Sequence, residues 1–501
     1  MNPAEGWPLW LRLVLAALLG ALGAFGLAPF GYWLATVVAL ILIVPLFLAS
    51  ETRIRAAWVG WVFATGYFAH ALSWITEPFQ VDAARHAWMA PFALVFLAGG
   101  LALFWAFAFW ASRQIGASAQ RQGLLLVVAL SLVEFGRGYL LTGFPWAGVA
   151  QVWVDTPIAQ ILSLIGPYGL GALTFAATLP VGAALFANRS IARFARPCAF
   201  TVVCVILALA YAAARPPVLE GENTVRLIQP NAPQHQKWDP DYELLFFTRQ
   251  IEFTAAQPKP DLIVWPETSV PGWLGNAQPH LTVIADAAQG TPVFLGIRRW
   301  DDPRIYNSMV YLDETGQQNG LYSKHHLAPF GEYVPFGDLL ARFGIYGLAA
   351  TTGNGFSSGP GPALMDAGKL GRALPLICYE AVFPQDVNGA PGRADFLLQI
   401  TNDAWFGARS GPYQHLAQAQ MRAIEQGLPM MRSANTGVSA MIDPLGQITA
   451  SLLLGQAGYV DAVLPRPHAA TFYSRTGDSP SFFALLVLFA MFWRNARRGR
   501  L

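Results

Sequence analysis

Hydrophobic residues are concentrated in two parts of this chain, and a long polar region separates them. Seven apolar runs fill the first 214 residues, and one more lies near the C-terminus. Most are long enough to cross a hydrocarbon core, which takes about 20 residues of helix. Gly166, Pro167 and Gly169 interrupt the sixth run, so only part of it is expected to span. The pattern predicts a bundle of about eight transmembrane helices, at 10–28, 31–49, 56–75, 88–111, 123–141, 158–187, 198–214 and 480–493.

Arginine is concentrated after every second apolar run, whereas the opposite loops contain little Lys or Arg apart from Arg85. By the positive-inside rule, both termini are cytoplasmic and the polar region lies outside the cytoplasm. The first run is soon followed by a second and shows no clear cleavage site, so it is interpreted as an anchor. The arginines that give this orientation are Arg53, Arg55, Arg113, Arg121, Arg189, Arg193, Arg196, Arg494, Arg497, Arg498 and Arg500.

The polar region alternates short apolar runs with amphipathic stretches, which is typical of an α/β layered domain. We therefore expect three parts: a seven-span bundle at 1–217, an α/β domain at 218–470, and a last span with a basic tail at 471–501. Helices are predicted at 242–256 and 413–426. Strands are predicted at 224–228, 261–265, 292–297, 306–312, 373–377, 396–400 and 437–442.

Composition agrees with a membrane protein that has a substantial polar part. The chain is 54% hydrophobic and 12% charged, with a mean hydropathy of +0.39, whereas ordinary soluble proteins carry about 25% charged residues. A net charge of +2 gives no reason to expect a nucleic-acid partner. No CxxC or HExxH pattern is present, and neither a metal nor another cofactor is expected.

Three ionisable residues stand out near the predicted strand ends of the polar region: Glu267, Lys324 and Cys378. Cys378 is the only cysteine in that region, because Cys198 and Cys204 lie in an apolar run. Each residue also has an ordinary explanation. An isolated cysteine is often a small buried apolar residue, Glu267 could cap a helix, and Lys324 could be a solvated surface charge. Because all three occur near strand ends of the same region, a shared functional site is expected.

The motifs around these residues resemble those of the nitrilase superfamily, which uses a Glu-Lys-Cys triad. They are W-P-E-T ending in Thr268, K-x-H-L-x-P-F-G-E-Y-V-P beginning at Lys324, and C-Y-E beginning at Cys378. Within that superfamily, the combination with membrane spans resembles the apolipoprotein N-acyltransferases. The resemblance covers nearly the whole chain, and implies a nitrilase-like αββα sandwich for the polar domain. It also includes TGFPW at 142–146, QPN at 229–231, YNS at 306–308 and TNDAWF at 401–406.

The resemblance implies a role for each site residue. Cys378 is the nucleophile, Glu267 is the general base, and Lys324 lowers the pKa of the thiol and stabilises the oxyanion. The backbone N–H of Tyr379 is expected to be the second oxyanion donor. Supporting roles fall to Asn307 and to two carboxylates, Glu332 and Glu380, of which Glu332 is expected to orient Lys324. Substrate-binding or lid roles fall to Trp146, Trp238, Leu339, Leu340 and Phe343.

The family's reaction implies the partners of this chain. The acyl donor is expected to be a phospholipid, with phosphatidylethanolamine as the expected type, and the acceptors are diacylglyceryl apolipoproteins. The product would be an amide on the α-amine of the lipid-modified N-terminal cysteine, formed through a Cys378 thioester. The expected location is the inner membrane of a bacterium, with the α/β domain in the periplasm and the chain embedded in the lipid bilayer as a monomer.

Two segments leave alternatives open. The apolar stretch 333–352 and the Gly/Pro-rich run 353–362 fit either a lid that touches the bilayer or an ordinary buried helix. Glu134 and Arg137 are spaced to pair on one helix face, although Arg137 could instead meet a lipid phosphate.

Two other functions remain as alternatives. A membrane-tethered amidase or nitrilase-type hydrolase would use the same triad with water as the acceptor. A transporter or receptor with an inactive domain is a second alternative, but the intact triad argues against it.

Overall fold

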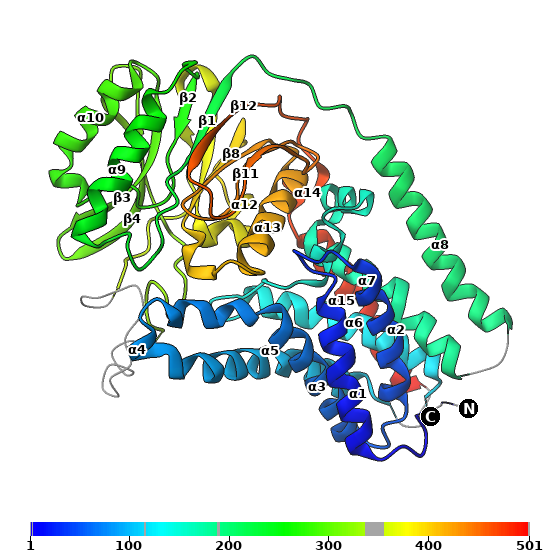
Figure 1. Ribbon diagram of the computed structural model, residues 1–501. Coiled ribbons are helices and arrows are strands. Elements are labelled where there is room, and N and C mark those ends of the chain that lie inside the picture. Colours follow the sequence, from blue (N-terminus) through cyan, green and yellow to red (C-terminus); the bar gives the residue numbers. More distant parts are fainter. Residues whose placement is uncertain (1, 3, 115–116, 188–190, 336–354, 499–501) are drawn as a thin grey trace. The chain divides into compact units, whose positions relative to one another are not determined.

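The computed structural model describes residues 2, 4–114, 117–187, 191–335 and 355–498 (Figure 1). The chain forms two compact units. The helical unit comprises Met1–Phe79, Ala84–Arg215 and Phe472–Leu501. The α/β unit comprises Gln80–Ala83 and Pro216–Thr471, so one continuous stretch of chain supplies nearly all of it.

Every apolar run of the sequence forms a helix of the helical unit. Three of these helices are long and apolar enough to cross a membrane, among the described residues: Ala83–Ser112, Pro157–Leu185 and Phe194–Ala213. Three others are apolar but shorter, so the count of eight spans stays a prediction. The eight helices are α1 (Leu9–Ala24), α2 (Trp33–Leu48), α3 (Arg53–Ala71), α5 (Ala90–Ser112), α6 (Ala119–Tyr139), α7 (Leu162–Ala187), α8 (Ile191–Ala213) and α15 (Ser479–Arg498).

The sixth apolar run forms α7, and this helix is interrupted at Gly166, as its sequence predicts. Gly166 has a φ of +65° inside α7, which breaks the helix into two parts. A side chain at this position would also collide with Tyr473, because an added Cβ would lie 2.0 Å from its ring. Glycine is therefore required at Gly166 both by the backbone conformation and by the close approach of Tyr473.

Two six-stranded sheets form the centre of the α/β unit. The first has the strand order β12-β1-β2-β3-β4-β5, and the second has the order β11-β10-β9-β8-β7-β6. The first sheet contains β1 (Thr224–Gln229), β2 (Leu262–Val264), β3 (Val293–Asp301), β4 (Arg304–Leu312), β5 (Gln318–Ser323) and β12 (Gly458–Val463). The second contains β6 (Met365–Asp366), β7 (Arg372–Ile377), β8 (Phe396–Thr401), β9 (Met430–Ala434), β10 (Ser439–Ile442) and β11 (Ile448–Leu452).

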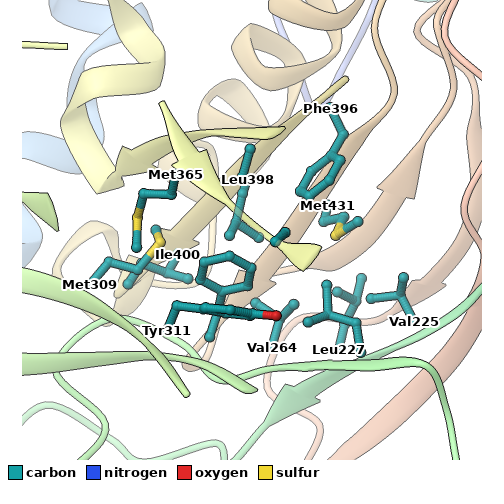
Figure 2. Close-up of a cluster of buried hydrophobic side chains, with 14 of the residues drawn as sticks. Val225, Leu227, Val264, Met309, Tyr311, Met365, Phe396, Leu398, Ile400 and Met431 are labelled. Carbon is teal, nitrogen blue, oxygen red and sulfur yellow. The ribbon is translucent and has the colours of Figure 1, made fainter. Parts of the chain in front are cut away.

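The sheets pack face to face, and helices cover their outer faces. Leu262 and Val264 of β2 belong to the core between the sheets, whereas Ile263 between them packs toward the helices. This alternation follows from the two-residue period of a strand, and burial on both faces explains the continuous apolar runs. Figure 2 shows the inter-sheet core, with side chains from both sheets meeting. The outer cores involve α9 (Pro240–Ala255) and α10 (Gln278–Ala288) on one side, and α12 (Pro384–Asn388) and α13 (Gly411–Gln426) on the other.

The predicted α/β sandwich is confirmed, and each predicted strand and helix of the polar region overlaps an observed one. The pattern missed β5, β6, β9, β11, β12, α10 and α12. β9 is buried throughout, but its apolar run is broken by Arg432 and Ser433. β5 and β11 are largely solvent-exposed, so neither shows a run of buried residues. β6 has two residues, and α12 has five, which is too short for a periodic signal.

Candidate active site

The three ionisable residues follow the ends of three different strands of the α/β unit. Glu267 lies shortly after β2, Lys324 directly follows β5, and Cys378 directly follows β7 as the first residue of the 3-10 helix η7 (Cys378–Val382). All three are buried, with exposed fractions of 6%, 1% and 8%. Burial at this depth requires each charge to have a partner.

Lys324 has two carboxylate neighbours. Its Nζ lies 2.7 Å from Glu332 Oε2 and 3.9 Å from Glu267 Oε1. Asn307 joins the same two carboxylates, because its Nδ2 donates to Glu267 Oε1 at 2.6 Å and to Glu332 Oε1 at 3.4 Å. The backbone N–H of Lys324 donates to Asn307 O at 2.8 Å. Glu332 and Asn307 therefore fix both the ammonium and the Glu267 carboxylate.

Glu267 is held at its other side by groups that the sequence did not indicate. The backbone N–H of Asn402, just after β8, donates to Glu267 Oε2 at 2.7 Å. Lys237 Nζ donates to the Glu267 carbonyl oxygen at 2.9 Å and to Thr268 Oγ1 at 3.2 Å. Each carboxylate oxygen of Glu267 thus accepts a hydrogen bond, and its backbone is held by a buried ammonium.

Cys378 has a strained backbone. Its φ is +52°, which is uncommon for a residue with a side chain and costs of order 1–3 kcal/mol. Two buried side chains contact its carbonyl oxygen: Gln399 Nε2 donates to it at 3.2 Å, and His415 Nε2 lies 3.0 Å from it. These contacts hold Cys378 in a turn that the chain would otherwise avoid.

A fully buried polar network continues behind that carbonyl. His415 Nδ1 lies 2.9 Å from Asp403 Oδ1, and Arg432 Nη2 donates to Asp403 Oδ2 at 2.5 Å. Arg432 Nη1 also donates to Gln399 Oε1 at 2.5 Å. The charges of Arg432 and His415 hold the pKa of Asp403 at about 2, although burial alone would raise it. A network with its groups paired in this way makes the base of the site rigid.

Burial has the largest effect on the protonation of Cys378. It raises the pKa of the Cys378 thiol well above its usual range, and Glu267 raises it further, whereas Lys324 lowers it. The expected lowering by Lys324 is therefore present but outweighed. Burial also raises the pKa of Glu267, while for Lys324 the nearby carboxylates overcome burial and raise the pKa. These shifts favour the neutral thiol of Cys378 and the charged ammonium of Lys324.

Glu380 contacts the chain around Lys324. It was predicted to have a supporting role, and its carboxylate binds residues on both sides of Lys324 in the sequence. Its Oε1 accepts from Tyr322 Oη at 2.8 Å and from the His325 backbone N–H at 2.8 Å, and its Oε2 accepts from the Ile377 backbone N–H at 2.7 Å. Glu380 therefore connects the lysine segment to the strand that ends in Cys378.

A pocket lies beside Glu267. Its lining includes Pro266, Thr268, Lys237, Trp238 and Glu243. Trp238, which the sequence suggested as a substrate-binding residue, is half-buried in its wall. Burial lowers the pKa of Lys237 to about 8.

Tyr379, the residue after Cys378, is buried, and its ring centroid lies 4.8 Å from that of Phe383. The role of its backbone N–H as an oxyanion donor stays a prediction. Leu339, Leu340 and Phe343, the predicted lid residues, lie outside the described residues.

Trp146 belongs to the helical unit and is fully buried there against Trp74, with ring centroids 4.5 Å apart. Its carbonyl oxygen accepts a hydrogen bond from Arg137 Nη1 at 2.7 Å. Arg137 forms the expected pair with Glu134, with contacts of 2.9 and 2.6 Å, so the pairing alternative is the one observed.

The residues that sequence reasoning missed had weak signals. Lys237 was one of only four lysines in the chain, and Asn402 lay within the TNDAWF segment at 401–406. Nothing in the sequence showed that either would touch Glu267, because more than 25 residues separate each from it. The sequence does not record which distant residues lie close together in the folded chain.

Comparison with known proteins agrees with this architecture. Residues 224–471 match the carbon-nitrogen hydrolase family, and residues 19–179 match the apolipoprotein N-acyltransferase N-terminal domain. The NitN amidase from Neterenkonia sp. AN1 aligns with 52% of this chain and 98% of its own, at 18% identity and a TM-score of 0.38.

Two full-length relatives are far more similar. The apolipoprotein N-acyltransferase of Rhodopseudomonas palustris is 36% identical, over 96% of this chain and 94% of its own length. That of Brucella melitensis is 35% identical, over 96% of this chain and 95% of its own length. At this identity and coverage, the chain belongs to the apolipoprotein N-acyltransferase family.

Proposed function

We propose that this protein transfers an acyl chain to the α-amine of the S-diacylglyceryl cysteine at the N-terminus of apolipoproteins. The relatives named above carry that activity in their names, over nearly the whole length of this chain. The observation that carries the proposal is the buried cluster of Glu267, Lys324 and Glu332 in the same unit as the strained Cys378. Acyl transfer through a thiol needs a base, an oxyanion partner and a nucleophile, and these residue types supply them.

The first half-reaction forms a thioester. Cys378 Sγ attacks the ester carbonyl carbon of the donor, and its proton passes to the Glu267 carboxylate. The Lys324 ammonium stabilises the oxygen that becomes negative in the tetrahedral intermediate, together with the Tyr379 backbone N–H. When the carbon–oxygen bond breaks, Glu267 returns the proton to the leaving alcohol. The high pKa of the Cys378 thiol supports a mechanism in which deprotonation accompanies attack.

The second half-reaction transfers the acyl chain to nitrogen. The α-amine attacks the thioester carbonyl carbon, a carbon–nitrogen bond forms, and the carbon–sulfur bond breaks. Glu267 takes the proton from the amine and passes it to the departing thiolate, which restores Cys378. An amide is less reactive than a thioester, so the reaction proceeds toward product.

The donor is proposed to be a membrane phospholipid, with phosphatidylethanolamine as the expected type. The apolar helices support a donor drawn from the bilayer, because a soluble donor would not require a membrane anchor. A single chain supplies Glu267, Lys324, Glu332 and Cys378, which supports a monomer.

Eight spans, cytoplasmic termini and a periplasmic α/β domain are also proposed. The arginines after the even-numbered apolar runs support this topology. Reporter fusions after Arg196 and at the C-terminus should give a cytoplasmic signal, and a fusion near Glu220 should give a periplasmic one. The opposite pattern would overturn the proposed topology, and with it the placement of the α/β domain on the periplasmic side of the inner membrane.

Intact-mass spectrometry tests the function. The full chain in detergent micelles that contain phosphatidylethanolamine should gain one acyl mass, located on Cys378 by peptide mapping, and Cys378→Ala should gain none. Addition of a diacylglyceryl lipopeptide should remove that mass and produce an acylated amine. Removal of the acyl mass at the same rate without the lipopeptide would identify a hydrolase instead.

A further inference from the structure

Arg298 is held between two indole rings on the α/β unit, and among the described residues none forms a hydrogen bond or ion pair with its guanidinium. Its guanidinium carbon lies 4.3 Å from the ring centroid of Trp238 and 4.8 Å from that of Trp273. Its Nε is buried and has no hydrogen-bond partner. The adjacent Arg299 also has a buried Nε without a hydrogen bond among the described residues, but its Nη1 donates to Asp301 Oδ2 at 3.0 Å. A positioned guanidinium with unused donors is suited to bind an oxyanion from outside the protein.

The backbone fixes where this cation lies. Arg298 of β3 is directly opposite Asn307 of β4 in the antiparallel pair, and it also forms a bridge with Trp273. Directly opposite residues project on the same face of a sheet, with Cβ atoms about 4.5–5.5 Å apart. Asn307 is the residue whose side chain donates to Glu267. Arg298 therefore projects on the same face of the sheet as Asn307, whose side chain contacts the Glu267 carboxylate.

The charges around the pocket suit a monoanion. Lys237 Nζ lies 5.3 Å from the Trp238 ring, so the same indole is close to two cations. Glu243 lines the pocket, and its negative charge acts on Arg298. Each cation already has a carboxylate near it, Glu243 for Arg298 and Glu267 for Lys237. These carboxylates repel a phosphodiester with one negative charge less than a dianionic phosphate, so the phosphodiester fits better.

The indoles point to a lipid as the source of that phosphate. Trp273 packs edge-on against Trp300, with ring centroids 5.9 Å apart, and Trp300 is 53% exposed. Tryptophan is favoured at membrane–water interfaces because its ring is apolar and its N–H is polar. An exposed indole beside an unpaired guanidinium presents both an apolar and a cationic contact, which is the chemistry of a phospholipid headgroup and not of a free ion.

From these contacts we propose that Arg298, framed by Trp238 and Trp273, binds the phosphodiester of the acyl-donor lipid and so positions its ester at Cys378. The proposal rests on the acyl transfer proposed above and adds the residue that recognises the donor's headgroup. Arg298 would act in binding, since the chemistry remains with Glu267, Lys324 and Cys378.

Two donors with identical acyl chains test the assignment in the same mixed micelles: phosphatidylethanolamine, and diacylglycerol, which has no phosphate. The measured quantity is the rate of acyl-enzyme formation on Cys378. Arg298→Ala should lower the rate about 10- to 100-fold more for the phospholipid than for the diacylglycerol, as for loss of a charge-assisted hydrogen bond. Arg298→Lys should lose less, because it keeps the charge without the planar fork. Arg299→Ala is the matched control, and should not change the ratio of the two rates.

Several results would overturn the proposal. Equal losses on both donors would mean that Arg298 has a structural role, and an unchanged rate would mean that it binds nothing. If Arg299→Ala changed the ratio of the two rates as much as Arg298→Ala does, the effect would come from general surface charge and not from a site at Arg298. Inhibition of the wild type by inorganic phosphate, absent in Arg298→Ala, would identify a free-phosphate site instead of a headgroup site.

Failure of the underlying function gives a different result. A wild-type chain that forms no acyl-enzyme from either donor would refute the acyl transfer itself. Headgroup binding is then measured in Cys378→Ala, by the change in tryptophan fluorescence on addition of glycerophosphoethanolamine. Loss of that change in the double variant with Arg298→Ala supports the binding site, and its retention overturns it.

Discussion

Gly296 lies in β3 directly behind the segment that carries Glu267, and its replacement by alanine is expected to slow acyl-enzyme formation. An added Cβ would lie 2.4 Å from Thr268 N, 2.7 Å from Pro266 O and 2.8 Å from Glu267 Cα. All three are backbone atoms, so no flexible side chain can move aside. The φ of Gly296 is not positive, and the predicted effect therefore comes from this contact and not from backbone strain.

The size of the effect follows from these distances. An ordinary contact begins near 3.4 Å, so the Glu267 segment must retreat by about 1 Å, and a misplacement of that size costs about 10²-fold in rate. The Glu267 carboxylate now accepts bonds of 2.6 and 2.7 Å from Asn307 and Asn402, which would lengthen by a similar amount. Overpacking of this kind also destabilises by about 1–3 kcal/mol.

The assay is the rate of acyl-enzyme formation, measured by intact mass on the full chain in detergent. Gly458→Ala is the matched control, because Gly458 also lies in a strand of the first sheet but its added Cβ would meet only the Leu452 side chain at 3.4 Å. The melting temperatures of both variants show whether a lower rate of acyl-enzyme formation is due to a loss of stability. A rate for Gly296→Ala within threefold of the wild type, or no lower than that of Gly458→Ala, would refute the reasoning.

Two further predictions concern Lys324 and His325. Lys324→Arg should lower the rate of acyl-enzyme formation roughly 10²–10³-fold. The Lys324 ammonium lies 2.7 Å from Glu332 and the residue is 1% exposed, so a planar guanidinium cannot replace it. Single-turnover rates close to the wild type would contradict this. His325 is partly buried, which lowers its pKa, but hydrogen bonds to Asp386 and Glu380 raise it to about 9. Because this folded-state pKa lies above the unfolded value of about 6.5, the stability that His325 adds should be complete below pH 6.5 and lost as the pH rises through 9. Melting temperatures of wild type and His325→Gln across that range should converge at high pH, and a difference that grows with pH would show the opposite linkage.

Some of the site could be located from the sequence because its residue types are rare there. A single cysteine in the polar region and a scarcity of lysine made Cys378 and Lys324 conspicuous. The strands that precede Glu267 and Cys378 were found because burial on both faces produces continuous apolar runs. The β5 strand before Lys324 was missed, because most of its residues are exposed.

The contacts of Glu380 and the raised pKa of the Cys378 thiol could not be predicted from the sequence, for the same physical reason. Local sequence placed Glu380 near the triad but could not show that its oxygens would accept backbone N–H groups of His325 and Ile377. Likewise, a neighbouring lysine lowers a thiol pKa, but the depth of burial decides whether that lowering prevails. Burial and hydrogen-bond partners depend on residues far apart in the chain.

The sequence by itself determined the apolar helices, the α/β class of the polar region and the three candidate residues Glu267, Lys324 and Cys378, because hydrophobic period and residue type are local properties. Only the tertiary structure decided which groups act on them. It placed Asn402 and Lys237 against Glu267, and Arg298 across the strand pair from Asn307. Such contacts arise when sheets pair and pack, and they join residues whose positions along the chain carry no record of that proximity.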